Sequence, residues 1–198
     1  MEVKAPTIFI ISGPSGAGKT TLINRLLCQK EIRRKFIRAI SFTTREQRPQ
    51  EKNKKDYIFV SKNEFLRLKK NNFFLEWQKV LDNYYGTPKY FYAQATEEKK
   101  DLILCIDVNG GMYLKKKHKI GKIVAIFVSA PNKKELFKRL QKRVEKKESI
   151  FKRLSLAKRE LKFAKHYDYA ITNTNIRDSV KKLQHVLLVT NRNQTRGG

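Results

Sequence analysis

The feature that most constrains this chain is a glycine-rich turn between an apolar run and an amphipathic segment. Residues 7–12 form the apolar run, which is typical of a parallel strand buried on both faces. After the turn, Leu22, Ile23, Leu26 and Leu27 recur at helical spacing. The turn itself has the spacing G-x-x-x-x-G-K-[ST] and reads Gly13-Pro14-Ser15-Gly16-Ala17-Gly18-Lys19-Thr20. Strand, turn and helix in this order predict a loop whose backbone N–H groups surround a phosphate.

Two side chains at the end of this turn predict a magnesium–nucleotide site. Lys19 is placed to reach the outer phosphates as a point charge, and the Thr20 hydroxyl is placed to ligate Mg²⁺. The glycines let the backbone approach the phosphate without a Cβ clash, and the following helix adds the partial positive charge of its N-terminus.

Composition excludes several other classes of protein. The chain has 198 residues, 40% of them hydrophobic, which is enough for a core despite a formal net charge of +27. No apolar stretch approaches the roughly 20 residues that span a bilayer. Two cysteines, Cys28 and Cys105, cannot form a disulfide framework, so we expect a cytoplasmic protein without a membrane partner.

The positive charge alone does not predict a nucleic-acid partner. Lysines and arginines lie along almost the whole chain, including 52–55, 115–117, 133–134 and 146–147. Such dispersion is more typical of a solvated surface than of a binding stripe. A nucleic-acid-binding protein would instead show affinity that falls steeply with salt, and we expect no specific nucleic-acid partner.

The rest of the chain alternates between strand and helix patterns, with one interruption. Buried strands are expected at 101–107, 123–128 and 169–172. Asn132 with Glu135 predicts the start of a helix; further helices are expected over 150–164 and from Val180, and a frayed tail over 191–198. Between residues 37 and 96 the pattern changes to β-type pieces at 37–42, 57–60, 73–80 and 84–86, with one helix capped by Ser61 and Glu64. We interpret this region as a mainly antiparallel lobe inserted into a parallel α/β core.

Several motifs in this order resemble the guanylate kinase family over almost the whole chain. Besides the phosphate-binding turn, they are Thr43-Thr44-Arg45-x-x-Arg48-Pro49-x-Glu51, Asp56-Tyr57-x-Phe59-Val60-Ser61, Phe74-Leu75-Glu76-Trp77, Asn83-Tyr84-Tyr85-Gly86-Thr87-Pro88 and Ile106-Asp107-Val108-x-Gly110. The resemblance implies transfer of the γ-phosphoryl group of ATP to GMP in purine nucleotide metabolism, with Mg²⁺ as cofactor. We expect a monomer or a homodimer, and the sequence does not decide between them. The resemblance also implies a P-loop core (1–36, 97–137 and 159–198), a GMP-binding lobe (37–96) and a helical lid (138–158).

The resemblance assigns roles to individual residues. ATP would be bound by the turn from Gly13 to Thr20, by Thr21 and by Asn173. GMP would be bound by Ser41, Arg45, Arg48, Glu51, Tyr57, Glu76, Tyr85, Thr87 and Asp107. Lys19 and the lid arginines Arg139, Arg143 and Arg153 would be catalytic, and Thr20 would hold Mg²⁺.

These residue types suit that chemistry. The acceptor phosphate is already anionic near neutral pH, with a second pKa of about 6, so no general base is needed. Arg45 and Arg48 can bind a phosphate through bidentate forks. Guanine presents N1–H and N2–H₂ donors on one edge, and the carboxylate of Glu76 can accept both.

Three departures from the family pattern are visible. Cys105 stands where the family usually has a carboxylate, and the lid lacks the usual Arg-Gly-Arg-Gly segment. Gln50 and Lys54 replace glycines, so we expect the turn there to differ, because positive φ is strained at such residues. Two alternative functions stay open: a non-catalytic interaction module of the same family, and a related P-loop kinase of a phosphorylated sugar.

Overall fold

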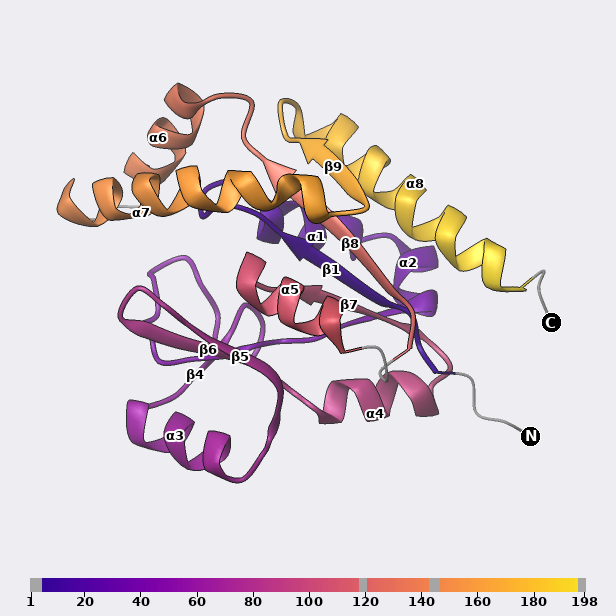
Figure 1. Cartoon of the computed structure of the whole chain (residues 1–198). Helices are drawn as coiled ribbons and strands as arrows, with labels where there is room; N and C mark the ends of the chain where they lie inside the picture. Colours follow the sequence, from indigo (N-terminus) through magenta and orange to yellow (C-terminus); the bar gives the residue numbers. More distant parts are fainter. Residues whose placement is uncertain (1–4, 118–120, 143–146, 196–198) are drawn as a thin grey trace. The chain divides into compact units, whose positions relative to one another are not determined.

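The computed structural model describes residues 5–117, 121–142 and 147–195 (Figure 1). It divides into two compact units. The first runs to Ile10 and continues from Arg34 to Ile123; the second comprises Ile11–Arg33 and the chain from Val124 onward.

A five-stranded sheet has the order β2-β7-β1-β8-β9. Its strands are β1 (Ile8–Ser12), β2 (Phe36–Arg38), β7 (Asp101–Cys105), β8 (Ile123–Ser129) and β9 (Tyr169–Thr172). The β2–β7 and β8–β9 pairs are parallel, and every side chain of β1 is buried. The boundary between the units lies inside β1, so β2 and β7 belong to the first unit and β8 and β9 to the second. The predicted α/β class with a parallel sheet and flanking helices is confirmed.

The first unit also contains helices that the sequence patterns did not predict. Helix α4 (Tyr90–Glu97) packs on β2 and β7, and α5 (Val108–Lys116) packs on β5 (Phe74–Val80). The predicted strand 101–107 is too long, because β7 ends at Cys105 and Asp107 caps the start of α5. A short helix, α2 (Lys30–Lys35), lies across the unit boundary in the sequence.

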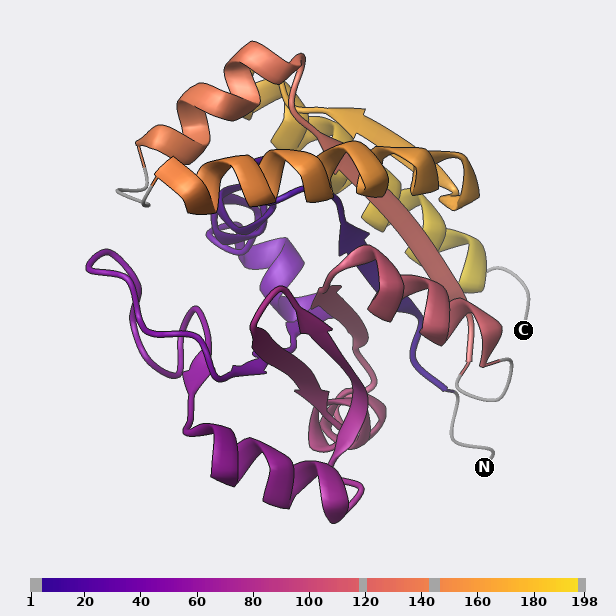
Figure 2. The ribbon, with the colours of Figure 1, turned by 60° about the vertical axis from the view of Figure 1, so that its left-hand side comes forward.

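A second sheet of the first unit has the order β4-β3-β6-β5 (Figure 2). The strands besides β5 are β3 (Phe42–Thr43), β4 (Ile58–Phe59) and β6 (Asn83–Pro88). Both pairs that involve β6 are antiparallel and only β3–β4 is parallel, in agreement with the mainly antiparallel interpretation. Helix α3 (Lys62–Lys70) begins where predicted, since the Ser61 hydroxyl accepts from Glu64 N–H at 3.1 Å.

The second unit surrounds its share of the parallel sheet with helices. They are α1 (Lys19–Leu26), α6 (Lys133–Gln141), α7 (Lys147–Glu160) and α8 (Ile176–Thr195), with a 3₁₀ turn at Leu161–His166. The predicted cap of α6 is confirmed, because Asn132 Oδ1 accepts from Glu135 N–H at 2.8 Å. Helix α6 packs against α7, and α8 packs against α1 (Figure 1).

Two boundary predictions in this unit are wrong. The helix expected over 150–164 ends at Glu160 and continues as the 3₁₀ turn. The tail expected to fray from 191 is helical as far as Thr195, because α8 continues without a glycine or proline to end it.

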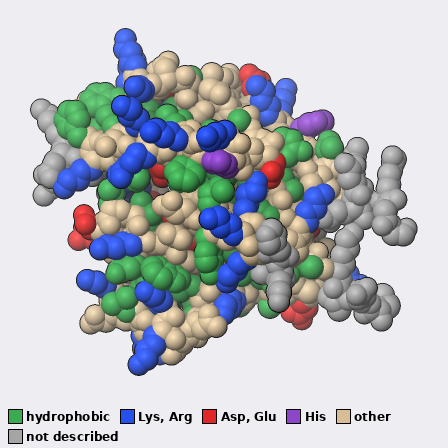
Figure 3. All heavy atoms as spheres, in the orientation of Figure 1, with side chains coloured by type: hydrophobic (Ala, Val, Ile, Leu, Met, Phe, Trp, Pro, Cys, Tyr) green, Lys and Arg blue, Asp and Glu red, His purple; other side chains and the backbone are tan. Residues whose placement is uncertain are grey.

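The face of the molecule shown in Figure 3 carries many basic side chains. Lys and Arg side chains on the face seen in Figure 3 alternate with hydrophobic and other polar groups. Within the described part of the chain, no helix has the length and apolar character needed to cross a membrane. Neither Cys28 nor Cys105 forms a disulfide.

Candidate active site

The phosphate-binding turn joins β1 to α1 in the second unit. Gly13, Gly16 and Gly18 have φ angles of 136°, 88° and 94°, a region that favours glycine. A Cβ on Gly13 would lie 1.9 Å from the carbonyl oxygen of Val128 on β8. The turn can therefore follow this path against β8 only with glycine at position 13.

Lys19 and Thr20 start helix α1 as expected. The Lys19 ammonium donates to the carbonyl oxygens of Gly13 and Pro14, the latter at 2.9 Å, so it lies across the mouth of the turn. Thr20 is half-buried, and its hydroxyl has no hydrogen-bond partner within the described residues. That hydroxyl is therefore available to a ligand.

An open cavity of about 460 Å³ lies beside the turn, within the second unit. Its lining includes Gly16, Gly18, Thr21, Arg25, Arg139 and Asn173. Asn173 Nδ2 donates to the Ala17 carbonyl at 2.8 Å. Arg139 donates to the carbonyl of Asn173 at 3.0 Å and to Glu135 Oε1 at 2.8 Å. Asn173 and Arg139, distant from the turn in sequence, thus lie on one side of it.

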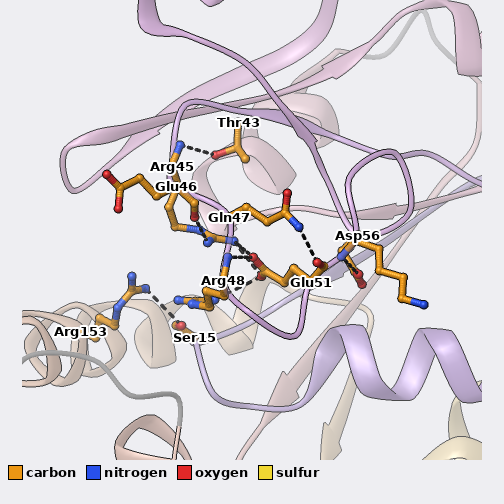
Figure 4. A network of polar contacts seen from close by, with 10 residues as sticks. Ser15, Thr43, Arg45, Glu46, Gln47, Arg48, Glu51, Asp56 and Arg153 are labelled. Carbon is orange, nitrogen blue, oxygen red and sulfur yellow. Dashed lines mark hydrogen bonds and ion pairs between the residues drawn. The ribbon is translucent and has the colours of Figure 1, made fainter.

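The three predicted lid arginines have different positions. Arg153 on α7 donates from Nη1 to the Ser15 hydroxyl at 3.3 Å (Figure 4). Arg139 on α6 is engaged with Glu135 and with backbone carbonyls. Arg143 lies outside the described residues. Of the two lid arginines that the structure describes, Arg153 contacts a side chain of the phosphate-binding turn and Arg139 contacts the Ala17 carbonyl of its backbone.

The predicted acceptor arginines meet a single carboxylate in the first unit (Figure 4). Arg45 Nη2 lies 2.8 and 2.9 Å from the two oxygens of Glu51. The Arg48 backbone N–H donates to Glu51 Oε2 at 3.0 Å, and Arg48 Nη1 lies 3.5 Å from Oε1. The two guanidinium groups are thereby oriented by one residue.

Tyr57 and Tyr85 lie beside Arg45. Their ring centroids are 6.0 Å apart in an edge-to-face arrangement, and the Arg45 guanidinium carbon is 5.5 Å from the Tyr57 ring centroid. Burial raises the pKa of the Tyr57 hydroxyl, and the nearby Cys105 and Tyr85 raise it further. The hydroxyl of Tyr57 therefore stays protonated at neutral pH and is a donor.

Glu76 lies at the end of a chain of hydroxyl groups. It is only 3% exposed, and its Oε1 accepts from the Thr87 hydroxyl at 2.6 Å. The Thr87 hydroxyl lies 3.3 Å from the Ser41 hydroxyl. Burial raises the pKa of Glu76 to about 8; the hydrogen bonds from Thr87 lower it and the charge of Asp107 raises it. The sequence grouped these three residues by family resemblance, and their direct contacts are visible only in the fold.

Asp107 was predicted to lie in a strand, but it lies after the end of β7, directly before helix α5. Its Oδ1 accepts from the backbone N–H groups of Asn109 at 2.6 Å and Gly110 at 3.1 Å, which caps helix α5. An acidic side chain directly before a helical segment was the signal that sequence analysis missed. Cys105, at the end of β7, is half-buried and is an electrostatic neighbour of Tyr57.

The turn that carries Gln50 and Lys54 departs from expectation at one residue. Lys54 adopts φ 61°, a left-handed conformation that is strained for a residue with a side chain, whereas Gln50 does not have positive φ. The reason is local hydrogen bonding: Lys54 N–H donates to the Tyr57 carbonyl at 2.8 Å and to Asn53 Oδ1 at 3.0 Å. These bonds hold the left-handed turn although glycine is absent.

The residues present fit Mg²⁺ in the manner of a nucleotide-bound ion. Within the described residues there is no group of three or more His, Cys, Asp or Glu side chains that could hold a metal alone. Magnesium bound to nucleotides takes few protein ligands and keeps substrate phosphates and waters. The Thr20 hydroxyl at the start of α1 has the chemistry of such a single ligand.

Comparison with known proteins identifies the family of this chain. The model of the family described as guanylate kinase matches residues 5–189. Guanylate kinase of Caldanaerobacter subterraneus subsp. tengcongensis is 40% identical over 186 residues, which are 93% of this chain and 88% of that protein. Guanylate kinase of Thermotoga maritima is 38% identical over 181 residues, covering 91% and 85% of the two chains.

A solved structure extends the similarity to three dimensions. The crystal structure of guanylate kinase from Anaplasma phagocytophilum matches with a TM-score of 0.74 and 28% identity, covering 94% of this chain and 87% of that one. The family match spans both units, including the phosphate-binding turn and the Arg45–Glu76 region. The chain therefore belongs to the guanylate kinase family, the ATP:GMP phosphotransferases with a P-loop.

Proposed function

We propose that this chain transfers the γ-phosphoryl group of ATP to GMP, giving ADP and GDP, and that the two units bind different nucleotides. The observation that carries this assignment is the buried carboxylate of Glu76, bonded to Thr87 in the same unit as Arg45 and Arg48. A phosphate-binding pair together with an acceptor for two N–H donors suits guanosine monophosphate, whereas a sugar phosphate offers no such edge. We propose that the protein works in the cytoplasm as a monomer or homodimer.

The acceptor phosphate would be bound by Arg45 and Arg48, with the hydroxyls of Tyr57 and Tyr85 as further donors. Glu51 would act on the arginines rather than on GMP, since both its oxygens are engaged with them. An oxygen of the GMP phosphate attacks the γ-phosphorus of ATP while the bond from that phosphorus to the β–γ bridging oxygen breaks. No general base is required, because the attacking oxygen is already anionic.

The donor nucleotide would be bound by the turn from Gly13 to Thr20, with its base in the cavity lined by Thr21, Arg139 and Asn173. Lys19 would move from the carbonyls of Gly13 and Pro14 to the β- and γ-phosphates, which offer it a stronger charged partner. Arg153, already at Ser15, would neutralise charge on the transferring group, and we assign Arg143 the same role. Arg139 would instead support the turn and the adenine side, as its present contacts suggest.

Thr20 would hold the Mg²⁺ that accompanies ATP, and the ion would supply positive charge to offset that of the nucleotide phosphates. The division into P-loop core, GMP-binding lobe at 37–96 and lid at 138–158 remains part of this proposal. Closure of the lid would exclude water and so limit hydrolysis of ATP.

A coupled assay of ADP release tests the proposal. GMP, AMP, dTMP, a phosphorylated sugar and no acceptor are compared at saturating Mg·ATP. We expect turnover with GMP that far exceeds the other acceptors, and Lys19→Ala should abolish it. Turnover only with the sugar phosphate, or none with any acceptor, would contradict the assignment.

The Glu76→Gln variant tests recognition of the guanine base separately from binding of the phosphate. An amide keeps one acceptor and adds a donor that opposes guanine N–H, so kcat/KM for GMP should fall roughly 10- to 100-fold. The KM for ATP should stay unchanged. Glu46→Gln is the matched control, since Glu46 is an exposed carboxylate of the same unit.

A further inference from the structure

The position of the Glu76 carboxylate depends on a residue that lacks a side chain. A Cβ built on Gly110 would lie 2.6 Å from Glu76 Oε2 and 3.4 Å from its Cδ. A third neighbour, Gln78 Cγ, would be 3.5 Å away, which is an ordinary contact. The clash with Glu76 is therefore specific to the carboxylate, and glycine leaves the space that the carboxylate occupies.

Helix α5 cannot easily give way in this contact. Its first turn is held by the Asp107 side chain, which accepts from Asn109 N–H and Gly110 N–H. The Gly111 N–H donates to the Asp107 carbonyl at 3.0 Å, and Val108, Gly110 and Leu114 are buried. Any group added at position 110 would thus displace the carboxylate rather than the helix.

The displaced atom belongs to the end of a flexible side chain, so the folding cost of an added methyl group is small. Gly110 does not have positive φ, and alanine is the better helix former by about 1 kcal/mol in a helix interior. A change at this position should therefore affect where Glu76 lies more than whether the protein folds.

We propose that Gly110 is a specificity-determining positioning residue, which reserves the space beside α5 where Glu76 must lie to accept from the guanine N1–H and N2–H₂ groups. This inference rests on the proposed function of the acceptor site. It assigns Gly110 no contact with the reacting atoms, and its effect passes through Glu76 alone. Asp107 contributes to the same arrangement by capping the helix that presents Gly110.

The test compares Gly110→Ala with Asn109→Ala. Both variants introduce alanine into the first turn of α5, but Asn109 is exposed, whereas Gly110 is buried. KM and kcat are measured with GMP and with IMP, which lacks the 2-amino group, and binding of GMP is titrated by calorimetry. For Gly110→Ala we expect the KM and Kd for GMP to rise roughly 10- to 100-fold and the preference for GMP over IMP to shrink. The KM for ATP and the Tm should stay near wild type, and Asn109→Ala should behave as wild type throughout.

A double-mutant cycle with Glu76→Ala shows whether the effect passes through the carboxylate. In the Glu76→Ala background, adding Gly110→Ala should raise the Kd for GMP less than about twofold above that of Glu76→Ala alone. If Gly110→Ala alone does not fold, the double variant must fold, because the clash is gone. Equal losses in both backgrounds, parallel changes in the KM for ATP and GMP, or an unfolded double variant would overturn the inference.

Failure of the proposed function would look different. A wild-type chain that binds GMP without phosphorylating it would contradict the proposed reaction, while the titrations would still decide the role of Gly110. A wild-type chain that does not bind GMP would overturn both.

Discussion

One nitrogen of Arg45, Nη2, lies 2.8 Å from Oε1 and 2.9 Å from Oε2 of Glu51, so a single carboxylate holds this guanidinium with both oxygens. The same carboxylate accepts from the backbone N–H of Arg48. Burial lowers the pKa of Arg45, but its hydrogen bonds to Glu51 and the nearby Tyr85, Glu51 and Tyr57 raise the pKa by more, so the net direction is upward. The two arginines are thus oriented before any phosphate arrives.

Replacing Glu51 by glutamine should weaken GMP binding. The amide nitrogen would face the Arg45 guanidinium, donor against donor, and the orientation of both arginines would be lost. We expect the KM for GMP to rise about 10-fold or more, with the KM for ATP unchanged, in steady-state assays.

Glu46→Gln is the control for Glu51→Gln. Glu46 lies in the same loop, but its carboxylate is exposed and points away from the Arg45–Glu51 contact in Figure 4. An equal rise in the KM for GMP in both variants would mean that only the net charge of the loop matters.

Affinity for GMP should depend on the ionisation of Glu76. Burial raises its pKa to about 8, the hydrogen bonds from Thr87 on β6 lower it, and Asp107, which caps α5, raises it. A protonated carboxyl group cannot accept both guanine donors, so the Kd for GMP should fall as the pH rises through about 8, with release of a proton on binding. Calorimetry between about pH 7 and 9, where the GMP phosphate is already dianionic, measures both effects. A pH-independent Kd in wild type, or the same pH dependence in Glu76→Gln, would refute this coupling.

The same residue should make stability depend on pH. In the unfolded chain Glu76 releases its proton near its ordinary pKa of 4.5, whereas the folded state retains it up to about 8. The folded state therefore binds more protons between these values, and the Glu76 contribution to stability falls as the pH rises through this window. Chemical denaturation measures the free energy of unfolding of wild type and of Glu76→Gln. From pH 5 to pH 8 the free energy of unfolding of the variant should increase relative to that of wild type. A constant difference would count against a raised pKa.

Asn173→Ala should affect the donor side only. The Asn173 side chain is 4% exposed, donates to the Ala17 carbonyl, and lies where a Cβ on Gly18 would come within 2.3 Å of it. Loss of its hydrogen bond should raise the KM for ATP about 2- to 10-fold without a change in the KM for GMP. Asn175→Ala, which removes hydrogen bonds to the first turn of α8, should lower the Tm but leave the KM for ATP unchanged.

Removal of the Thr20 hydroxyl should lower the apparent affinity of the enzyme for Mg²⁺. Thr20→Ala should raise the Mg²⁺ concentration for half-maximal activity by at least about 10-fold, because a direct ligand is lost. Thr20→Ser keeps the hydroxyl and should restore the wild-type requirement. An unchanged requirement in Thr20→Ala would show that Thr20 is not a ligand.

Local features of the chain were predicted well from sequence because their physics is local. The strand–turn–helix around Gly13–Thr20 is encoded by contiguous apolar residues, glycines and a helical repeat. The caps at Ser61 and Asn132 need only a side chain and a backbone N–H three residues later. The β-type pieces between residues 37 and 96 predicted mainly antiparallel pairing, which the β3–β6 and β5–β6 pairs confirm.

Features that depend on distant partners could not be predicted in this way. Helices α4 and α5 have weak local signals, and they are stabilised by packing on β2, β7 and β5. The left-handed φ of Lys54 was missed for a different reason: its hydrogen bond to the Tyr57 carbonyl is local, but lysine has no preference for this conformation that a sequence pattern could reveal.

The sequence by itself determined the family and the order of the candidate site residues, because residue type and spacing along the chain carry that information. The tertiary structure alone decided that Glu76 is buried against Thr87 and that Gly110 leaves space for its carboxylate. The charge state and the position of a side chain depend on the atoms around it, which β5, β6 and α5 bring together only when the chain folds.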